Sequence, residues 1–274
     1  MNSLFPRIAI AVALAASLAT TAAHAGAIRN ASSFTTVLPA NDDGSTGPVA
    51  LGFNINFYGL ANQSLVYVNN NGNITFNGPL SQYTPGGILT STTPIIAPFF
   101  ADVDTRGTGS APVRYGQATI DGRAAFGVNW INVGVFNSQN IFNSFQLIMT
   151  NRSDIAAGDF DFEFNYDSIL WEAGTASGAP VGGLGGQSAA VGYTDGGDTD
   201  FQLLGSNVNG ALVNGGSRAL ISNSLNSNVA GRYVFQVRSG TVQPTNGVPE
   251  PGSLALVGLA LAGVAVASRR RLRA

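Results

Sequence analysis

The chain contains no cysteine and no lysine, and its only histidine is His24. Without cysteine, neither a disulfide framework nor a thiolate metal site can form. A chain without histidine has no imidazole for Ser-His-Asp or Cys-His catalysis or for a histidine-bound metal. His24 falls in an N-terminal segment that we expect to be removed, so the mature chain should contain no histidine. We therefore expect no catalytic residue, and only a carboxylate is left to act as a base.

Charged residues are also scarce, at 10% of the 274 residues. Between residues 26 and 247 there are eight arginines and fourteen acidic residues, a net charge of −6. Because nucleic-acid binding requires a basic patch that neutralises phosphates, nucleic acid is excluded as a partner. A mildly acidic surface suits divalent cations instead. About 220 residues are enough for one sizeable core, so residues 26–247 are predicted to form one domain, ending in a linker at 239–247.

The N-terminal 25 residues have the pattern of a secretory signal peptide. Arg7 supplies the positive charge, an apolar run follows from Ile8 to Ala19, and small residues at Ala23 and Ala25 flank His24. This order of charge, apolar run and small-residue site is typical of a segment cleaved by signal peptidase. The sequence therefore predicts export, with residues 1–25 removed.

The C-terminal segment, residues 248–274, reads "VPEPGSLALVGLALAGVAVASRRRLRA". Its sixteen-residue apolar stretch, 253–268, would span roughly 24 Å as a helix, somewhat less than the hydrocarbon core of a bilayer. The stretch lacks a polar face, and a basic cluster that would stay in the cytoplasm follows it, so we predict one short transmembrane helix. The prolines and the glutamate before it are Pro249, Glu250 and Pro251, and the basic cluster is Arg269, Arg270 and Arg271.

This tail resembles a PEP-CTERM sorting signal of Gram-negative bacteria. The resemblance implies recognition by an exosortase in the inner membrane, transient anchoring there, and removal of the tail. It also implies delivery to the cell surface or extracellular matrix, and an association with exopolysaccharide production.

The body is rich in Gly, Asn, Ser and Thr between short β-branched and aromatic runs, which indicates an all-β sandwich with hairpins and Gly-rich loops. In "DFDFEFNYD" (159–167) aromatic residues alternate with polar ones, so the aromatic face should be buried and the acidic face solvated. "LVYVNNNGNITF" and the Asp121-Gly122 pair predict hairpins. Trp130 and Trp171 fit core positions better than exposed sugar-stacking platforms.

Five segments of the body, in order across roughly 50–238, resemble a nidogen-like (NIDO) domain. They are "LGFNINFYG…LVYVNNNGNITFN", "PIIAPFFADVDTRGTG…VRYG", "FGVNWINVGVF…NSFQLIMT", "DFDFEFNYDSILWE" and "AAVGYTDGGD". The resemblance implies an extracellular domain associated with cell–matrix adhesion. Animal members of the family carry it beside other modules, whereas in this sequence we expect it to be the single folded domain.

Asp102 and Asp104 are the leading candidates for a site, because they share one face at the end of an apolar run. Buried carboxylates need a partner. Three partners remain open: an ion pair with Arg106 or Arg114, a calcium ion, or a substrate sugar if the pair are the acid and base of a glycoside hydrolase.

The stretch "YTDGGDTDF" offers three more carboxylates within six residues: Asp195, Asp198 and Asp200. Acidic Gly-rich loops of this kind bind calcium, although the EF-hand spacing is absent. The alternative is an exposed turn. A calcium ion shared with Asp102 and Asp104 requires the two segments to meet in space.

Together these features predict an exported, non-catalytic surface or matrix protein. Its expected partners are signal peptidase, an exosortase, the inner membrane during sorting, and exopolysaccharide or matrix proteins. Its only expected cofactor is calcium. The alternative is a carboxylate-based polysaccharide hydrolase.

Overall fold

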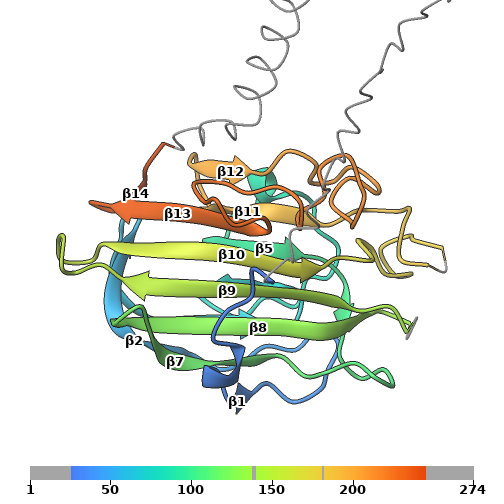
Figure 1. Cartoon of the computed structure of the whole chain (residues 1–274), viewed down its shortest axis with the longest axis horizontal. Helices are drawn as coiled ribbons and strands as arrows, with labels where there is room; N and C mark the ends of the chain where they lie inside the picture. Colours follow the sequence, from blue (N-terminus) through green and yellow to red (C-terminus); the bar gives the residue numbers. More distant parts are fainter. Residues whose placement is uncertain (1–25, 138–139, 181, 245–274) are drawn as a thin grey trace, which may run out of the picture.

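The computed structural model describes residues 26–137, 140–180 and 182–244, which form two packed antiparallel sheets (Figure 1). The larger sheet has the order β1-β7-β8-β9-β10-β13-β14, with β6 pairing on β8, and the smaller has the order β12-β11-β5-β4-β3-β2. The prediction of an all-β sandwich is confirmed. No helix within the described ranges is long and apolar enough to cross a membrane. The predicted signal peptide and the predicted transmembrane helix at 253–268 lie outside those ranges.

The larger sheet contains β1 (Thr36–Val37), β6 (Val103–Asp104), β7 (Arg114–Ile120), β8 (Arg123–Val135), β9 (Asn143–Asn151), β10 (Phe160–Ser168), β13 (Arg232–Arg238) and β14 (Thr241–Val242). The smaller contains β2 (Val49–Phe57), β3 (Leu60–Asn69), β4 (Asn73–Thr75), β5 (Ile95–Phe100), β11 (Ala190–Thr194) and β12 (Asp200–Gln202). Two short 3₁₀ turns, η1 (Ala31–Ser33) and η2 (Ile88–Thr90), lie in the connections.

Both predicted hairpins form. β3 and β4 pair across the Asn-rich turn, and β7 and β8 pair across Asp121 and Gly122. These two turn residues have φ values of 49° and 77°, as a type I′ turn requires. Local turn chemistry therefore sets the register of the β7–β8 hairpin.

The core lies between the two sheets and is mainly aromatic. Phe99 of the smaller sheet packs against Phe145 of the larger one, with ring centroids 5.2 Å apart, and against Trp171 at 5.7 Å. Trp130 also stacks on Phe145, with ring centroids 5.3 Å apart. Both tryptophans are fully buried, so the prediction that they are core residues is confirmed.

The acidic face of β10 differs from the prediction. Its aromatic face is buried as expected, but the opposite face is covered by arginines rather than solvated. Arg29 donates to Glu163 at 2.7 Å from an N-terminal segment that crosses the sheet (Figure 1). Asp161 pairs with Arg152 and Arg238, each at 2.6 Å. The prediction failed because Arg29 and Arg238 come from distant parts of the chain.

Candidate functional site

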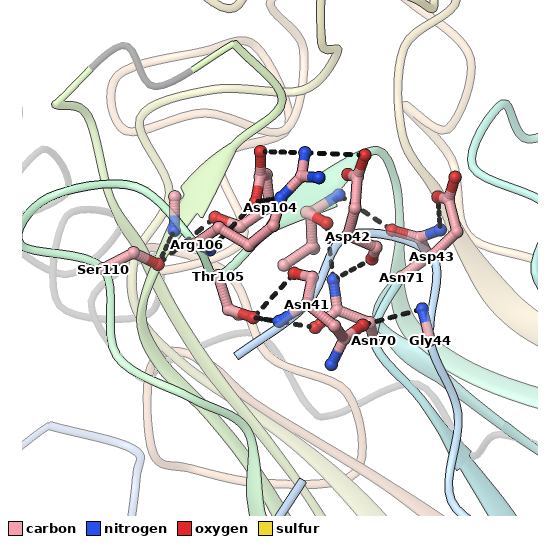
Figure 2. Close-up of polar contacts among 12 residues, drawn as sticks. Asn41, Asp42, Asp43, Gly44, Asn70, Asn71, Asp104, Thr105, Arg106 and Ser110 are labelled. Atoms are coloured by element: carbon pink, nitrogen blue, oxygen red, sulfur yellow. Dashed lines mark hydrogen bonds and ion pairs between the residues drawn. The ribbon is translucent and has the colours of Figure 1, made fainter. Parts of the chain in front are cut away.

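Residues of the β1–β2 connection, the β3–β4 turn and the segment around β6 meet at the acidic site (Figure 2). Asp42 and Asp43 belong to the β1–β2 connection, and the β3–β4 turn supplies two asparagines. Asp102 lies between β5 and β6, where the chain passes from the smaller sheet to the larger one. The site therefore sits across the join between the sheets.

The β3–β4 turn holds this arrangement together through Asn71. Its side-chain amide donates to Asp43 Oδ1 at 2.8 Å, while its Oδ1 accepts the backbone N–H of Val103 at 3.0 Å. Gly72 follows with a φ of 74°, and a Cβ there would lie 1.8 Å from the carbonyl oxygen of Phe99. Only glycine fits a turn packed this closely against β5.

Asn70 ties the β1–β2 connection to β6. Its side-chain amide donates to the carbonyl oxygen of Val103 at 2.5 Å and also to that of Asp42. The backbone carbonyl oxygen of Asn70 accepts the indole N–H of Trp130 at 3.0 Å. The turn that carries the asparagines is thus fastened to the core.

Asp104 is fully engaged by Arg106. The guanidinium donates to both carboxylate oxygens at 2.9 Å, and the backbone N–H of Arg106 donates to Oδ1 at the same distance. The guanidinium also reaches Asp42 Oδ2 at 2.9 Å, as Figure 2 shows. Of the alternatives for Asp104, the ion pair with Arg106 is the one that forms, whereas Arg114 donates to the backbone of Thr35.

Asp102 is in a different position, because no arginine reaches it. Its side chain is 1% exposed, and its Oδ2 accepts a long hydrogen bond, at 3.4 Å, from the Ser177 hydroxyl. Gly174 leaves room for this carboxylate, since a Cβ there would lie 2.2 Å from Oδ2. Burial, together with the charges of Asp42 and Asp43, raises the pKa of the Asp102 carboxyl to about 7.

Asp42 feels the same effects more weakly. Burial, with the nearby charges of Asp104 and Asp43 and against the opposing charge of Arg106, raises the pKa of its carboxyl to about 6. Of the four carboxylates in this cluster, Asp42 and Asp104 pair with Arg106. The ionised cluster therefore carries an excess of negative charge.

The other predicted carboxylates lie elsewhere. Asp195 follows β11, whose last residue, Thr194, pairs with Ile95 at the start of β5, whereas Asp102 comes after the end of β5. The two acidic segments therefore lie at opposite ends of a six-residue strand and do not form one shared site. Asp195 Oδ1 accepts the backbone N–H groups of Gly197 and Thr199 at 2.7 and 3.2 Å, which closes the turn before β12.

Sequence reasoning missed Asp42 and Asp43. One carboxylate oxygen from each, together with one from Asp102, lie within 4.8 Å of one another. The available signal was "NDDG", a turn-forming stretch with paired acids. That signal is generic, and nothing in it identifies residues about sixty positions away as its neighbours.

Comparisons with known proteins agree with this architecture. The nidogen-like domain model matches residues 64–239, and the PEP-CTERM protein-sorting motif matches residues 247–271. Alpha-tectorin of Homo sapiens is 33% identical over 241 residues, which cover 79% of this chain and 11% of that protein. Alpha-tectorin of Gallus gallus is 30% identical over 235 residues, or 77% of this chain and 10% of that protein. No solved structure gives a significant match.

The chain belongs to the nidogen-like domain family. It spans about a tenth of the length of the curated relatives that it matches. The sorting motif that follows the domain implies processing by an exosortase. The protein is therefore an exported surface or extracellular protein that carries a matrix-type domain.

Proposed function

We propose that the processed protein is a non-catalytic component of the extracellular matrix, where it associates with exopolysaccharide or with matrix proteins. The observation that carries the proposal is the pairing of the two matches. A nidogen-like domain at 64–239 is followed directly by a sorting motif at 247–271. In this proposal signal peptidase removes residues 1–25, the tail anchors the chain transiently in the inner membrane, and an exosortase then releases it to the surface.

The state of Asp104 supports a non-catalytic role. A glycoside hydrolase needs two carboxyl groups that are free to donate and accept protons or to attack the sugar. Both oxygens of Asp104 are instead held by the Arg106 guanidinium, in a fork-to-fork ion pair that occupies the carboxylate. This counts against Asp102 and Asp104 as the acid and base of a polysaccharide hydrolase.

Co-sedimentation tests the proposal directly. The processed protein, purified from the host's surface, is incubated separately with the polysaccharide fraction and the protein fraction of the same matrix. Retention by one fraction supports matrix association and identifies the class of partner. Recovery of all the protein in the supernatant with both fractions would contradict it.

An assay for reducing ends tests the absence of catalysis. We expect no release of reducing ends from the polysaccharide fraction. Release that Asp102→Asn abolishes would establish the hydrolase instead.

A further inference from the structure

Asp102 differs from the other strongly buried carboxylates of the described chain in lacking a strong partner. Glu163 is held by Arg29 at 2.7 Å, and Glu172 accepts two backbone N–H groups at 2.6 and 2.7 Å. Asp102 accepts one hydroxyl hydrogen bond at 3.4 Å, beyond the 2.5–3.0 Å usual for such bonds. A buried charge left in this state is costly, so the position points to a missing counter-charge.

Asp42 gives a second, separate sign of the same deficit. Its Oδ2 is paired with Arg106, but its Oδ1 is buried and has no hydrogen-bond partner in the structure. Because buried polar atoms are almost always satisfied, an unsatisfied carboxylate oxygen beside other carboxylates indicates a ligand at that point.

The spacing of the three carboxylates fits one ion. Calcium binds oxygen ligands at about 2.3–2.6 Å, so two ligands on opposite sides of it are about 4.6–5.2 Å apart. One oxygen each from Asp42, Asp43 and Asp102 fall within 4.8 Å of one another. Asp43 is already oriented by Asn71, which donates to its Oδ1 at 2.8 Å and leaves further lone pairs for a metal.

From this geometry we propose that Asp42, Asp43 and Asp102 bind a divalent cation, and that the cation is calcium. The donor set consists of hard carboxylate oxygens, with no sulfur or imidazole, which favours calcium or magnesium over zinc or copper. Loops from separate parts of the chain suit the flexible coordination of calcium better than the strict octahedron of magnesium. Affinity in the range of extracellular modules, about 10⁻⁴–10⁻³ M, is expected.

The bound cation joins parts of the chain that are far apart in sequence. Asp42 and Asp43 come from the β1–β2 connection, and Asp102 comes from the link between the sheets. Ser177 carries the effect to the loop after β10, since its hydroxyl contacts both Asp102 and Thr84. Calcium thus closes this end of the sandwich, whatever the protein binds in the matrix.

The test uses the processed protein and calcium chloride alone, with the melting temperature and isothermal titration calorimetry as readouts. At 5 mM calcium and the affinity given above, we expect the melting temperature to rise by about 2–9 °C relative to a chelator. Calorimetry should show one site per chain. Identical melting temperatures in calcium and in chelator, with no heat of binding, would overturn the proposal.

Three variants locate the site. Asp102→Asn keeps the size of the buried side chain but removes its charge, and Asp43→Asn does the same at a less buried position; both should lose the calcium-dependent shift. The matched control is Asp198→Asn at the exposed turn before β12, which should keep the whole shift. If Asp102→Asn does not fold, Asp43→Asn still decides the question. A full shift in Asp43→Asn, or its loss in Asp198→Asn, would refute this site.

Discussion

Replacement of Trp130 by phenylalanine tests whether the aromatic core holds the acidic site in place. The indole is fully buried, and its N–H donates to the carbonyl oxygen of Asn70 at 3.0 Å. Phenylalanine can keep the stacking on Phe145 but cannot donate this hydrogen bond. The carbonyl would then keep only the backbone N–H of Gly72 as a donor, at 2.8 Å, and would lose its link to the core at the turn that positions the asparagines of the site.

The expected loss of stability has two parts. Because the carbonyl keeps the Gly72 N–H, the loss of the indole hydrogen bond costs about 0.5–1.5 kcal/mol. The smaller ring leaves a cavity of roughly 40 Å³, which at about 24 cal/mol per Å³ costs about 1 kcal/mol more. The free energy of unfolding should therefore fall by about 1.5–2.5 kcal/mol, equivalent to a melting temperature lower by about 3–10 °C for a domain of this size.

Urea unfolding of the processed protein, followed by far-ultraviolet circular dichroism, measures this change. The matched control is Leu204→Ala, because Leu204 is 74% exposed and its truncation should alter stability by no more than about 0.5 kcal/mol. A loss below about 1 kcal/mol for Trp130→Phe would refute the reasoning, since it would mean that the hydrogen bond from the indole to the Asn70 carbonyl does not stabilise the protein.

Three further predictions concern sorting, backbone strain and the hydrogen bonds of a buried carboxylate. The double change Pro249→Ala and Glu250→Ala should leave the tail attached, because it removes the Pro-Glu-Pro segment; mass spectrometry of the surface protein would contradict this if the mass matched the normal product. Gly72→Ala should cost about 2 kcal/mol or more, since its Cβ would lie 1.8 Å from the Phe99 carbonyl oxygen; an unchanged urea midpoint would count against that clash. Glu172→Gln should cost about 1–3 kcal/mol. Each carboxylate oxygen of Glu172 accepts one backbone N–H, and the glutamine amide nitrogen cannot accept, so one N–H would lose its acceptor. A melting temperature equal to that of the unchanged protein would contradict this prediction.

The strands and hairpins could be predicted because their signals are local. The alternation from Phe160 to Tyr166 needs only neighbours two residues apart to define a buried face. Asp121 and Gly122 need only tolerate positive φ to close β7 onto β8. The charged face of β10 could not be predicted, because Arg29 lies 134 residues from Glu163.

The acidic site shows the same division. The sequence indicated that Asp102 would be buried and would need a partner, because it follows an apolar run. It did not indicate that Arg106 would pair with Asp104 and not with Asp102, nor that Asp42 and Asp43 would approach Asp102. These contacts depend on how the β1–β2 connection folds against the β3–β4 turn, which is decided by long-range hydrogen bonds from Asn70.

By itself, the sequence determined that this protein is exported, that it is built of β-strands, and that it has no thiol and a single imidazole, that of His24. Each of these follows from composition or from a short contiguous pattern. Only the tertiary structure decided which carboxylates share an ion pair and which meet without one. The tertiary structure also decided that the two acidic segments lie apart. The physical reason is the antiparallel pairing of β5 with β11, which places the turn at Asp195 at one end of β5 and Asp102 at the other.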